Sequence, residues 1–260
     1  MTSTTPGRRE RQREATYAEI VTTARTLLAE GKELSLRAIA QRMGITAPAL
    51  YRYVASYQEL VDLVAFEIDK AATATFAEAA ARYPDDDPAG QLVAATAAFR
   101  AWALTNPREF GLIFANPIAD SSCVRRELLT SATSGHYMNG LLVRIWQERG
   151  IAHPSLDELE PSVREAVLDP LLPIDASTIP AAERGVIWIF MRAWQTLYGV
   201  VTLEVFGHMD PRVIESAAMF TAAMHSQLPP LGLEAEPEGS RLKAILAAEL
   251  AAQSSPWQNP

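Results

Sequence analysis

Apolar residues recur at intervals of three and four positions along nearly the whole chain, and this helical spacing is the feature that most limits its fold. The first clear case is the set Ile20, Ala24, Leu27 and Leu28, which ends at Gly31. We find no convincing stretch in which apolar and polar residues alternate as in a half-buried strand. The chain of 260 residues is long enough to bury a sizeable core. The sequence therefore predicts an all-α protein.

Helix starts are marked by capping residues and by proline. Three pairs, Asp87–Pro88, Asn106–Pro107 and Asp210–Pro211, combine a cap with a proline at the first helical position, where the missing N–H has no cost. Ser56 and Glu59 form a capping box for a helix that runs to about residue 83. Further helices are predicted over 88–105, 107–115, 122–149, 161–168, 181–206, 211–227 and about 240–252. The proline-rich segment 151–180 is predicted to be a long irregular connection around the short helix at 161–168.

Charge is distributed unevenly along the chain. The formal net charge is −8, but residues 1–60 hold 9 Lys/Arg against 6 Asp/Glu. Such asymmetry suggests that the N-terminal end faces nucleic acid. Much of the positive charge lies in Arg8, Arg9, Arg11 and Arg13, and a run of this kind is more often a solvated tail than a DNA-binding arm. We therefore expect a basic, flexible tail over residues 1–14.

Two short helices at about 35–43 and 46–54 have the proportions of a helix-turn-helix, with Ser35 as a cap and Gly44 in the turn. At 100° per residue, Leu50 and Val54 share the face that should pack on the preceding helices. Pro48 and Arg52 lie roughly opposite, where small side chains allow close approach to DNA and a guanidinium can reach a base edge or a phosphate. The start of the next helix, at Ser56, offers free N–H groups to a phosphate. Periodicity alone leaves an alternative open, in which this is a short helix of an all-α core whose tyrosines merely pack.

The segment 35–64, SLRAIAQRMGITAPALYRYVASYQELVDLV, resembles the DNA-binding domain of the TetR family of transcriptional repressors. The matching features are L-x-x-I-A on the first helix, G-I-T in the turn, and A-L-Y-x-Y-V followed by S-x-x-E-L, and with the preceding helix the resemblance covers about 16–64. It implies a homodimeric all-α protein with an N-terminal three-helix DNA-binding domain and a C-terminal ligand-binding domain. It also implies DNA contacts from Arg37, Thr46, Ala47, Pro48, Ala49, Tyr51, Arg52 and Tyr53. The family commonly has lysine just after the helix cap where this chain has Tyr57, whose phenol hydroxyl would have to make the phosphate contact.

The segment 185–208, GVIWIFMRAWQTLYGVVTLEVFGH, is similar to a TetR-type C-terminal subclass that carries a tryptophan, then histidine–glycine, then L-E. Here Tyr198 replaces the histidine before Gly199. The segment reads as a long helix that is apolar on most faces, as expected for a helix packed on both its own core and a partner. We expect the helices at 181–206 and 211–227 to form a four-helix dimer interface with those of a second copy. A purely intramolecular core is the competing interpretation.

Aromatic and polar side chains of the C-terminal part are candidates for an effector pocket. Most aromatic residues at helical spacing are core residues, so only some of these should touch a ligand, which we expect to be mostly apolar. The candidates are Trp102, Phe110, Phe114, His136, Tyr137, Trp146, Trp188, Trp194, Arg192 and Gln195.

No pattern indicates an enzyme, a cofactor or a metal site. The four histidines are scattered, and no zinc-protease, nucleophile-elbow or nucleotide-binding motif occurs. Glu204 and His208, four residues apart, could share a metal, but two ligands are too few and a surface or capped pair is the simpler interpretation. The single cysteine, Cys123, excludes an internal disulfide. The basic N-terminus is not followed by the apolar segment of a secretory signal, and the run VIWIFM at 186–191 is far shorter than a membrane span. We therefore expect a soluble cytoplasmic protein.

The sequence thus predicts four regions: a basic tail (1–14), a helix-turn-helix domain (15–62), a ligand-binding and dimerisation domain (63–230) and a C-terminal extension (231–260). The expected function is a dimeric repressor that a small apolar molecule releases from a palindromic double-stranded DNA operator. Activation stays open, because the sequence does not place the operator relative to a promoter. The alternative function is an all-α small-molecule-binding protein or enzyme whose DNA module is non-functional.

Overall fold

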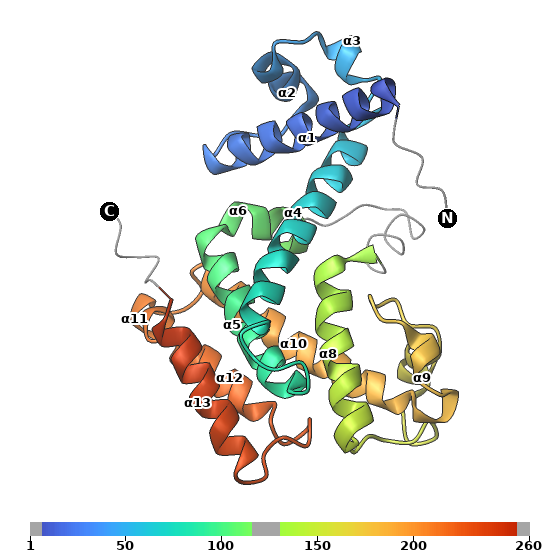
Figure 1. Ribbon diagram of the computed structural model, residues 1–260, viewed down its shortest axis with the longest axis vertical. Helices are drawn as coiled ribbons and strands as arrows, with labels where there is room; N and C mark the ends of the chain where they lie inside the picture. Colours follow the sequence, from blue (N-terminus) through green and yellow to red (C-terminus); the bar gives the residue numbers. More distant parts are fainter. Residues whose placement is uncertain (1–6, 116–130, 254–260) are drawn as a thin grey trace. The chain divides into compact units, whose positions relative to one another are not determined.

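The computed structural model describes residues 7–115 and 131–253, and within those ranges its regular elements are all helices (Figure 1). The expected all-α fold is therefore confirmed. The main helices are α1 (Arg8–Ala29), α2 (Leu36–Met43), α3 (Ala47–Leu50), α4 (Tyr57–Ala80), α5 (Pro88–Thr105), α6 (Pro107–Phe110), α8 (Thr133–Arg149), α9 (Pro161–Leu168), α10 (Gly185–Val205), α11 (Pro211–Glu215), α12 (Ala218–Ser226) and α13 (Glu238–Ala251). A π-helix (Gly111–Ala115) follows α6, and two short 3₁₀ helices (Ala176–Thr178 and Ala181–Glu183) precede α10.

The chain divides into two units, which we describe separately. The first unit contains the described residues of 1–69 and 108–117, and the second contains those of 70–107 and 118–260. The division falls within α4, so this helix contributes to both units.

The first unit has a core of aliphatic side chains from α1 to α4. The fully buried residues of these four helices include Ile20, Ala24, Ile39, Leu50, Leu60, Val61, Val64 and Ile68. Arg108, just before the π-helix, donates hydrogen bonds to the carbonyl oxygens of Leu28 and Ala29 at 3.2 and 2.9 Å. The Leu28 carbonyl oxygen also accepts from the Gly31 N–H at 3.0 Å, and Arg108 adds a side-chain cap to this C-terminal end of α1.

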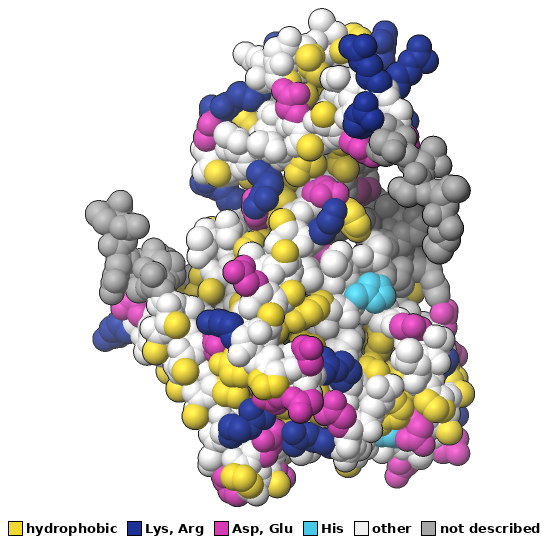
Figure 2. Space-filling view, viewed as in Figure 1, with side chains coloured by type: hydrophobic (Ala, Val, Ile, Leu, Met, Phe, Trp, Pro, Cys, Tyr) yellow, Lys and Arg dark blue, Asp and Glu magenta, His cyan; other side chains and the backbone are white. Residues whose placement is uncertain are grey.

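The N-terminal arginines are helical, so the expected flexible tail over 1–14 is wrong for residues 8–14, whereas residues 1–6 lie outside the described residues. α1 begins at Arg8, one residue after its N-cap Gly7. Residues 8–14 are good or moderate helix formers without glycine or proline, so the helix nucleated by the core at Ile20 can extend toward the N-terminus. Figure 2 shows Lys and Arg side chains gathering over this end of α1.

The second unit is built around α5, which contacts α8, α10 and α13. Much of α5 is alanine, and its small side chains let the neighbouring helices approach closely. An aromatic cluster packs beside it: Phe76 and Phe99 meet edge to face at 5.6 Å, and Trp194 stacks on Tyr198 at 5.6 Å.

A buried ion pair joins α5 to α10. Arg100 donates from Nε to Glu204 Oε2 at 2.6 Å and from Nη2 to the carbonyl oxygen of Ile214 at 2.6 Å. Burial raises the pKa of Glu204, and Arg100 opposes that rise. The interpretation of Glu204 as half of a surface or capped pair with His208 is therefore wrong, because Glu204 is buried against Arg100 and His208 is exposed.

The predicted helix over 211–227 is broken into α11 and α12. Ala217 lies between them at φ 52°, in the left-handed region. The carbonyl oxygen of Ile214, which a continuous helix would pair with residue 218, accepts hydrogen bonds from Arg100 and from the Ala217 N–H. A tertiary contact therefore ends the first helix.

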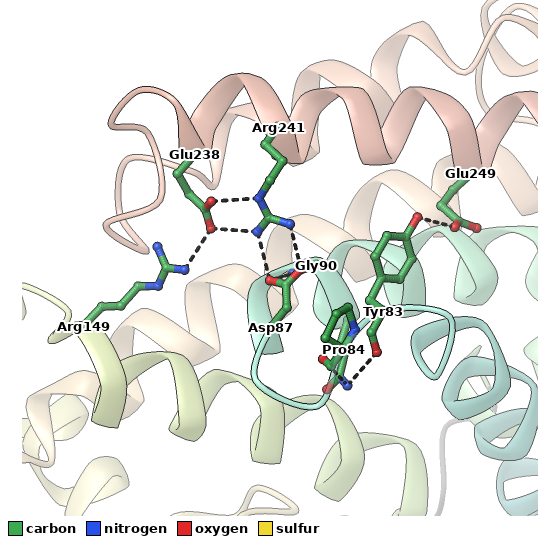
Figure 3. A network of polar contacts seen from close by, with 9 residues as sticks. Tyr83, Pro84, Asp87, Gly90, Arg149, Glu238, Arg241 and Glu249 are labelled. Atoms are coloured by element: carbon green, nitrogen blue, oxygen red, sulfur yellow. Dashed lines mark hydrogen bonds and ion pairs between the residues drawn. The ribbon is translucent and has the colours of Figure 1, made fainter.

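The C-terminal extension is part of the second unit, because α13 packs along α5. Arg241 binds both carboxylate oxygens of Asp87, the N-cap of α5, and also binds Glu238 (Figure 3). At the other end of α13, Glu249 accepts a 2.7 Å hydrogen bond from the hydroxyl of Tyr83 and pairs with Arg82. Burial and this carboxylate raise the pKa of Tyr83 to about 12. The α4–α5 turn is thus held by polar contacts at both ends of α13.

Other predicted boundaries differ by a few residues. The helix over 88–105 and the short helix over 161–168 are confirmed, whereas 107–115 is α-helical only to Phe110 and α10 begins at Gly185. The first part of the predicted helix 122–149, with Cys123, lies outside the described residues.

Among the described residues, one helix, α10, is long and apolar enough to span a membrane by length and composition. Core helices of soluble proteins satisfy the same criterion, and α10 carries the ion-paired Glu204.

Candidate nucleic-acid interface

α2 begins and ends where its capping residues predict. The hydroxyl of Ser35 accepts a hydrogen bond from the Ala38 N–H at 3.2 Å. Gly44 at the other end has φ 68°, a conformation that glycine adopts without the steric cost of a Cβ atom. The Ile45 N–H then bonds back to the carbonyl oxygen of Ala40 at 3.0 Å, so the chain reverses within a few residues.

α3 begins at a second cap, where the hydroxyl of Thr46 accepts from the Ala49 N–H at 3.3 Å. Its regular α-helix covers only Ala47–Leu50, so the predicted helix over 46–54 is too long. Turns continue the same path, since the N–H groups of Tyr53 and Val54 both bond to the carbonyl oxygen of Leu50. The segment is too short to be stable as an isolated helix, so the buried side chain of Leu50 holds it in place.

The predicted division between a packed and an exposed face is present. Leu50 and Val54 are 0% and 1% exposed, so they fix α3 to the core of its unit. The candidate DNA-contacting residues that are exposed are Arg37, Thr46, Pro48, Tyr51, Arg52 and Tyr57, and those that are half-buried are Ala47, Ala49 and Tyr53. These candidates thus present polar, cationic and phenolic groups beside small apolar ones, the mixture that backbone and base-edge contacts need.

Tyr53 is positioned by α1, through a residue that the sequence analysis missed. Its ring meets that of Tyr17 edge to face at 5.7 Å, and the Tyr17 hydroxyl donates to the Tyr53 carbonyl oxygen at 3.1 Å. Arg13 in turn donates to the Tyr17 hydroxyl at 3.1 Å. Tyr17 lies three residues before Ile20 and therefore on the core face of α1, and this spacing could have predicted that it packs on a neighbouring element.

α4 begins at the predicted cap Ser56, but the Glu59 carboxylate reaches back to the residue before the cap, Ala55. The Ser56 hydroxyl accepts from the Glu59 N–H at 3.1 Å, and the Glu59 carboxylate accepts from the Ala55 N–H at 2.6 Å. Tyr57, the first residue of α4, is 51% exposed, so its hydroxyl is accessible at the position where the resemblance would place a lysine.

The cations near this surface differ in how they are neutralised. Lys32 and Arg42 both pair with Glu30, and these contacts lower the pKa of that carboxyl group. No ion pair to Arg37 or Arg52 is seen within residues 7–115 and 131–253. Their charges therefore remain available to phosphates.

The predicted effector residues are spread over both units. Trp102 lines a groove of about 380 Å³ in the second unit, between the C-terminal half of α4, α5 and α13. Its wall also includes Thr75, Arg82, Asn106, Glu249 and Gln253.

The remaining candidates lie elsewhere. Phe110 and Phe114 belong to the first unit, where their rings contact each other at 5.0 Å. Tyr137, Trp146 and Trp188 are half-buried on α8 and α10, and burial raises the pKa of Tyr137. His136, Arg192 and Gln195 are exposed. Trp194, a further candidate, packs on Phe99 and Tyr198.

Within the part of the chain that the structure describes, no group of three or more His, Cys, Asp or Glu side chains could hold a metal ion.

The known proteins to which this chain is similar are described as transcriptional or regulatory proteins. The family profile described as "Tetracyclin repressor-like, C-terminal domain" matches residues 92–227, more than half of the chain. The HTH-type transcriptional regulators Rv1816 of Mycobacterium tuberculosis and Mb1846 of Mycobacterium bovis are each 28% identical over 228 residues, which cover 81% of this chain and 92% of each relative. The crystal structure of the regulatory protein SCO4313 has a TM-score of 0.59 and 26% identity, and the match covers 87% of this chain and 100% of that one. The similarity therefore extends over both units.

Proposed function

Because the chain belongs to the TetR family of transcriptional regulators, we propose that it is a homodimeric repressor whose hold on its operator is controlled by a small, mostly apolar molecule. It is a DNA-binding regulator and not an enzyme. The observation that carries the finer proposal is the α3 segment, which is fixed by buried Leu50 and Val54 and leaves Pro48, Tyr51 and Arg52 exposed.

In this proposal α3 enters the major groove. Arg52 reaches a guanine edge or a phosphate, and Pro48 with Ala49 allows apolar contact with a thymine methyl group. Thr46, Tyr51 and Tyr57 donate hydroxyl hydrogen bonds to phosphates, and Arg37 adds a phosphate contact from α2. Ala47 and the half-buried Tyr53 complete the surface, Tyr53 mainly by holding the backbone against α1.

The dimer is proposed to form through α10 and the α11–α12 segment, the helices expected at 181–206 and 211–227. Three large apolar side chains are exposed there: Leu203 at 43%, Phe206 at 41% and Met219 at 50%. Gly199 on α10 has no neighbouring atom within 4 Å of an added Cβ position, which leaves room for a close helix from a second copy. Two copies then read half-sites about one DNA turn, roughly 34 Å, or a multiple of it apart on a near-palindromic operator.

The effector is proposed to occupy the groove beside Trp102. Its volume of about 380 Å³ is within the range of small-molecule sites, and its lining combines apolar side chains such as Trp102 with polar and charged ones. Because α4 lines the groove and also begins next to the capping box at Ser56, a ligand that favours one position of α4 would change operator affinity. A regulator of this kind acts on DNA in the cytoplasm.

The proposal requires that Arg52→Ala weaken binding to the DNA upstream of the protein's own gene. Loss of a bidentate base contact costs about 1–3 kcal/mol, which is roughly 5- to 150-fold in the dissociation constant. Fluorescence anisotropy with labelled duplex measures this change, and far-UV circular dichroism checks that the variant is folded. Lys32→Ala is the matched control, because Lys32 is exposed on the same unit but pairs with Glu30. Unchanged affinity of a folded Arg52→Ala protein would refute the assignment of α3 as the DNA-reading segment.

A further inference from the structure

The first two turns of α1 extend beyond the core of their unit. Residues 8–15 are all exposed, and the first fully buried side chain of the helix is Ile20. These two turns contain Arg8, Arg9, Arg11 and Arg13. They continue the helix that the core stabilises at Ile20, and their side chains are open to water or to a ligand.

Contacts place these turns beside the DNA-reading segment. Arg13 bonds to the Tyr17 hydroxyl at 3.1 Å and lies over the Tyr17 ring at 5.5 Å, and Tyr17 bonds to the carbonyl oxygen of Tyr53 at 3.1 Å. Arg9 and Arg13 continue, at a spacing of four, the stripe on which Tyr17 lies. At 1.5 Å per residue, Arg9 is about 12 Å further along the axis than Tyr17, a length of three to four base pairs.

Part of the charge pattern is unfavourable for the helix itself. Cations in the first turn oppose the helix dipole, and Arg9 and Arg13 form a like-charge pair four residues apart. The two acidic residues, Glu10 and Glu14, also lie four apart and share a single face. The remaining faces carry only arginine, glutamine and alanine. Glu10 in the first turn favours the helix, and Arg11 and Arg13 have partners, but neither fact explains the charge of Arg8 and Arg9, which a polyanion beside α3 would.

We infer that the first two turns of α1 form a second DNA contact, in which Arg8 and Arg9 bind phosphates next to the site read by α3. The contact is independent of base sequence, and it adds electrostatic affinity and a longer footprint to the half-site. This inference rests on the proposed function, because it needs α3 to be seated on DNA.

The test compares the salt dependence of binding. Each phosphate contact contributes about 0.9 to the slope of log affinity against log salt concentration. The variant Arg8→Gln/Arg9→Gln should therefore lower the magnitude of that slope by about 1.8 for each bound copy of the chain. The loss of affinity should be the same for the operator and for unrelated duplex DNA, and larger at 50 mM than at 200 mM salt. Folding is not at risk, since both side chains are exposed and glutamine removes an unfavourable charge from the helix start.

Lys32→Gln/Lys243→Gln is the control, with the same change in net charge at two exposed positions away from these turns. It should keep the wild-type slope. If the arginine variant keeps the wild-type slope while the wild type binds its operator, the inference is wrong and the proposed function stands. If the control loses as much slope as the arginine variant, the effect is one of total charge and the inference is again wrong. If the wild type does not bind DNA at any salt concentration, the proposed function and this inference both fail.

Discussion

Replacing Arg100 by methionine should destabilise the protein much more than replacing an exposed arginine. Arg100 pairs with Glu204, which is 1% exposed, and it also donates to the carbonyl oxygen of Ile214. Removing one partner of a buried pair costs about 3–5 kcal/mol, because the other charge stays buried without compensation. For a protein of this size that cost corresponds to a Tm lower by roughly 10 °C.

The deficit should also depend on pH. Burial raises the pKa of Glu204 above its unfolded value of 4.5, and without the guanidinium that rise is larger. A group whose folded pKa is raised gives its full stability below the unfolded pKa and loses it as the pH rises through the folded pKa. The Tm deficit of Arg100→Met should therefore shrink as the pH is lowered from 8 toward 5.

Thermal unfolding followed by far-UV circular dichroism measures both effects. The double variant Arg100→Met/Glu204→Leu should recover much of the lost Tm, because an apolar pair can replace a buried ion pair at little cost. Arg212→Met is the matched control, since Arg212 binds Asp210 in a comparable geometry but is 87% exposed, and its Tm should equal that of the wild type. A deficit below about 2 °C for Arg100→Met, or a double variant whose loss is the sum of the two single losses, would refute the reasoning.

Two further predictions concern the turn before α3 and the attachment of α13. Gly44→Ala should lower the free energy of unfolding by about 1–2 kcal/mol through backbone strain at φ 68°. Nothing lies within 4 Å of the added Cβ atom, so a steric clash would not contribute. Urea unfolding measures this change, and an unchanged stability would exclude strain at the turn. Although burial raises the pKa of Asp87, hydrogen bonds from Arg241 and the Gly90 N–H lower it below its ordinary value of 3.8. Its stabilising effect is therefore present above that pH and lost as the pH falls through the folded pKa. Arg241→Met should lower the Tm at pH 7 but not below about pH 3, and a constant deficit across that range would show that the ion pair is not the cause.

Local chemistry was enough to predict the elements whose ends depend on nearby residues. α5 starts at the Asp87 cap and has Pro88 as its first residue, and the turn after α2 depends on Gly44. The burial of Leu50 and Val54 also followed from helical spacing alone. These features were predictable because each depends on contacts within one or two turns.

Features that depend on distant residues were not predictable. The break at Ala217 arises because Arg100, more than a hundred residues earlier, takes the carbonyl oxygen of Ile214. The support of Tyr53 by Tyr17 required knowing where α1 passes α3. The groove beside Trp102 has α13 as one wall, and no sequence pattern indicated that this helix packs on α5.

The packing of α13 bears on where the C-terminal domain ends. The family profile stops at residue 227, but α13 lies beyond it and buries Leu242 and Leu246 at 1% and 2% exposure. A protein shortened to the profile boundary would lose the partners of Asp87 and Tyr83 and would expose the apolar face of α5 to water. In this chain the functional length of the domain exceeds its recognisable length, so the C-terminal helix belongs to any version of the protein intended for crystallisation or binding studies.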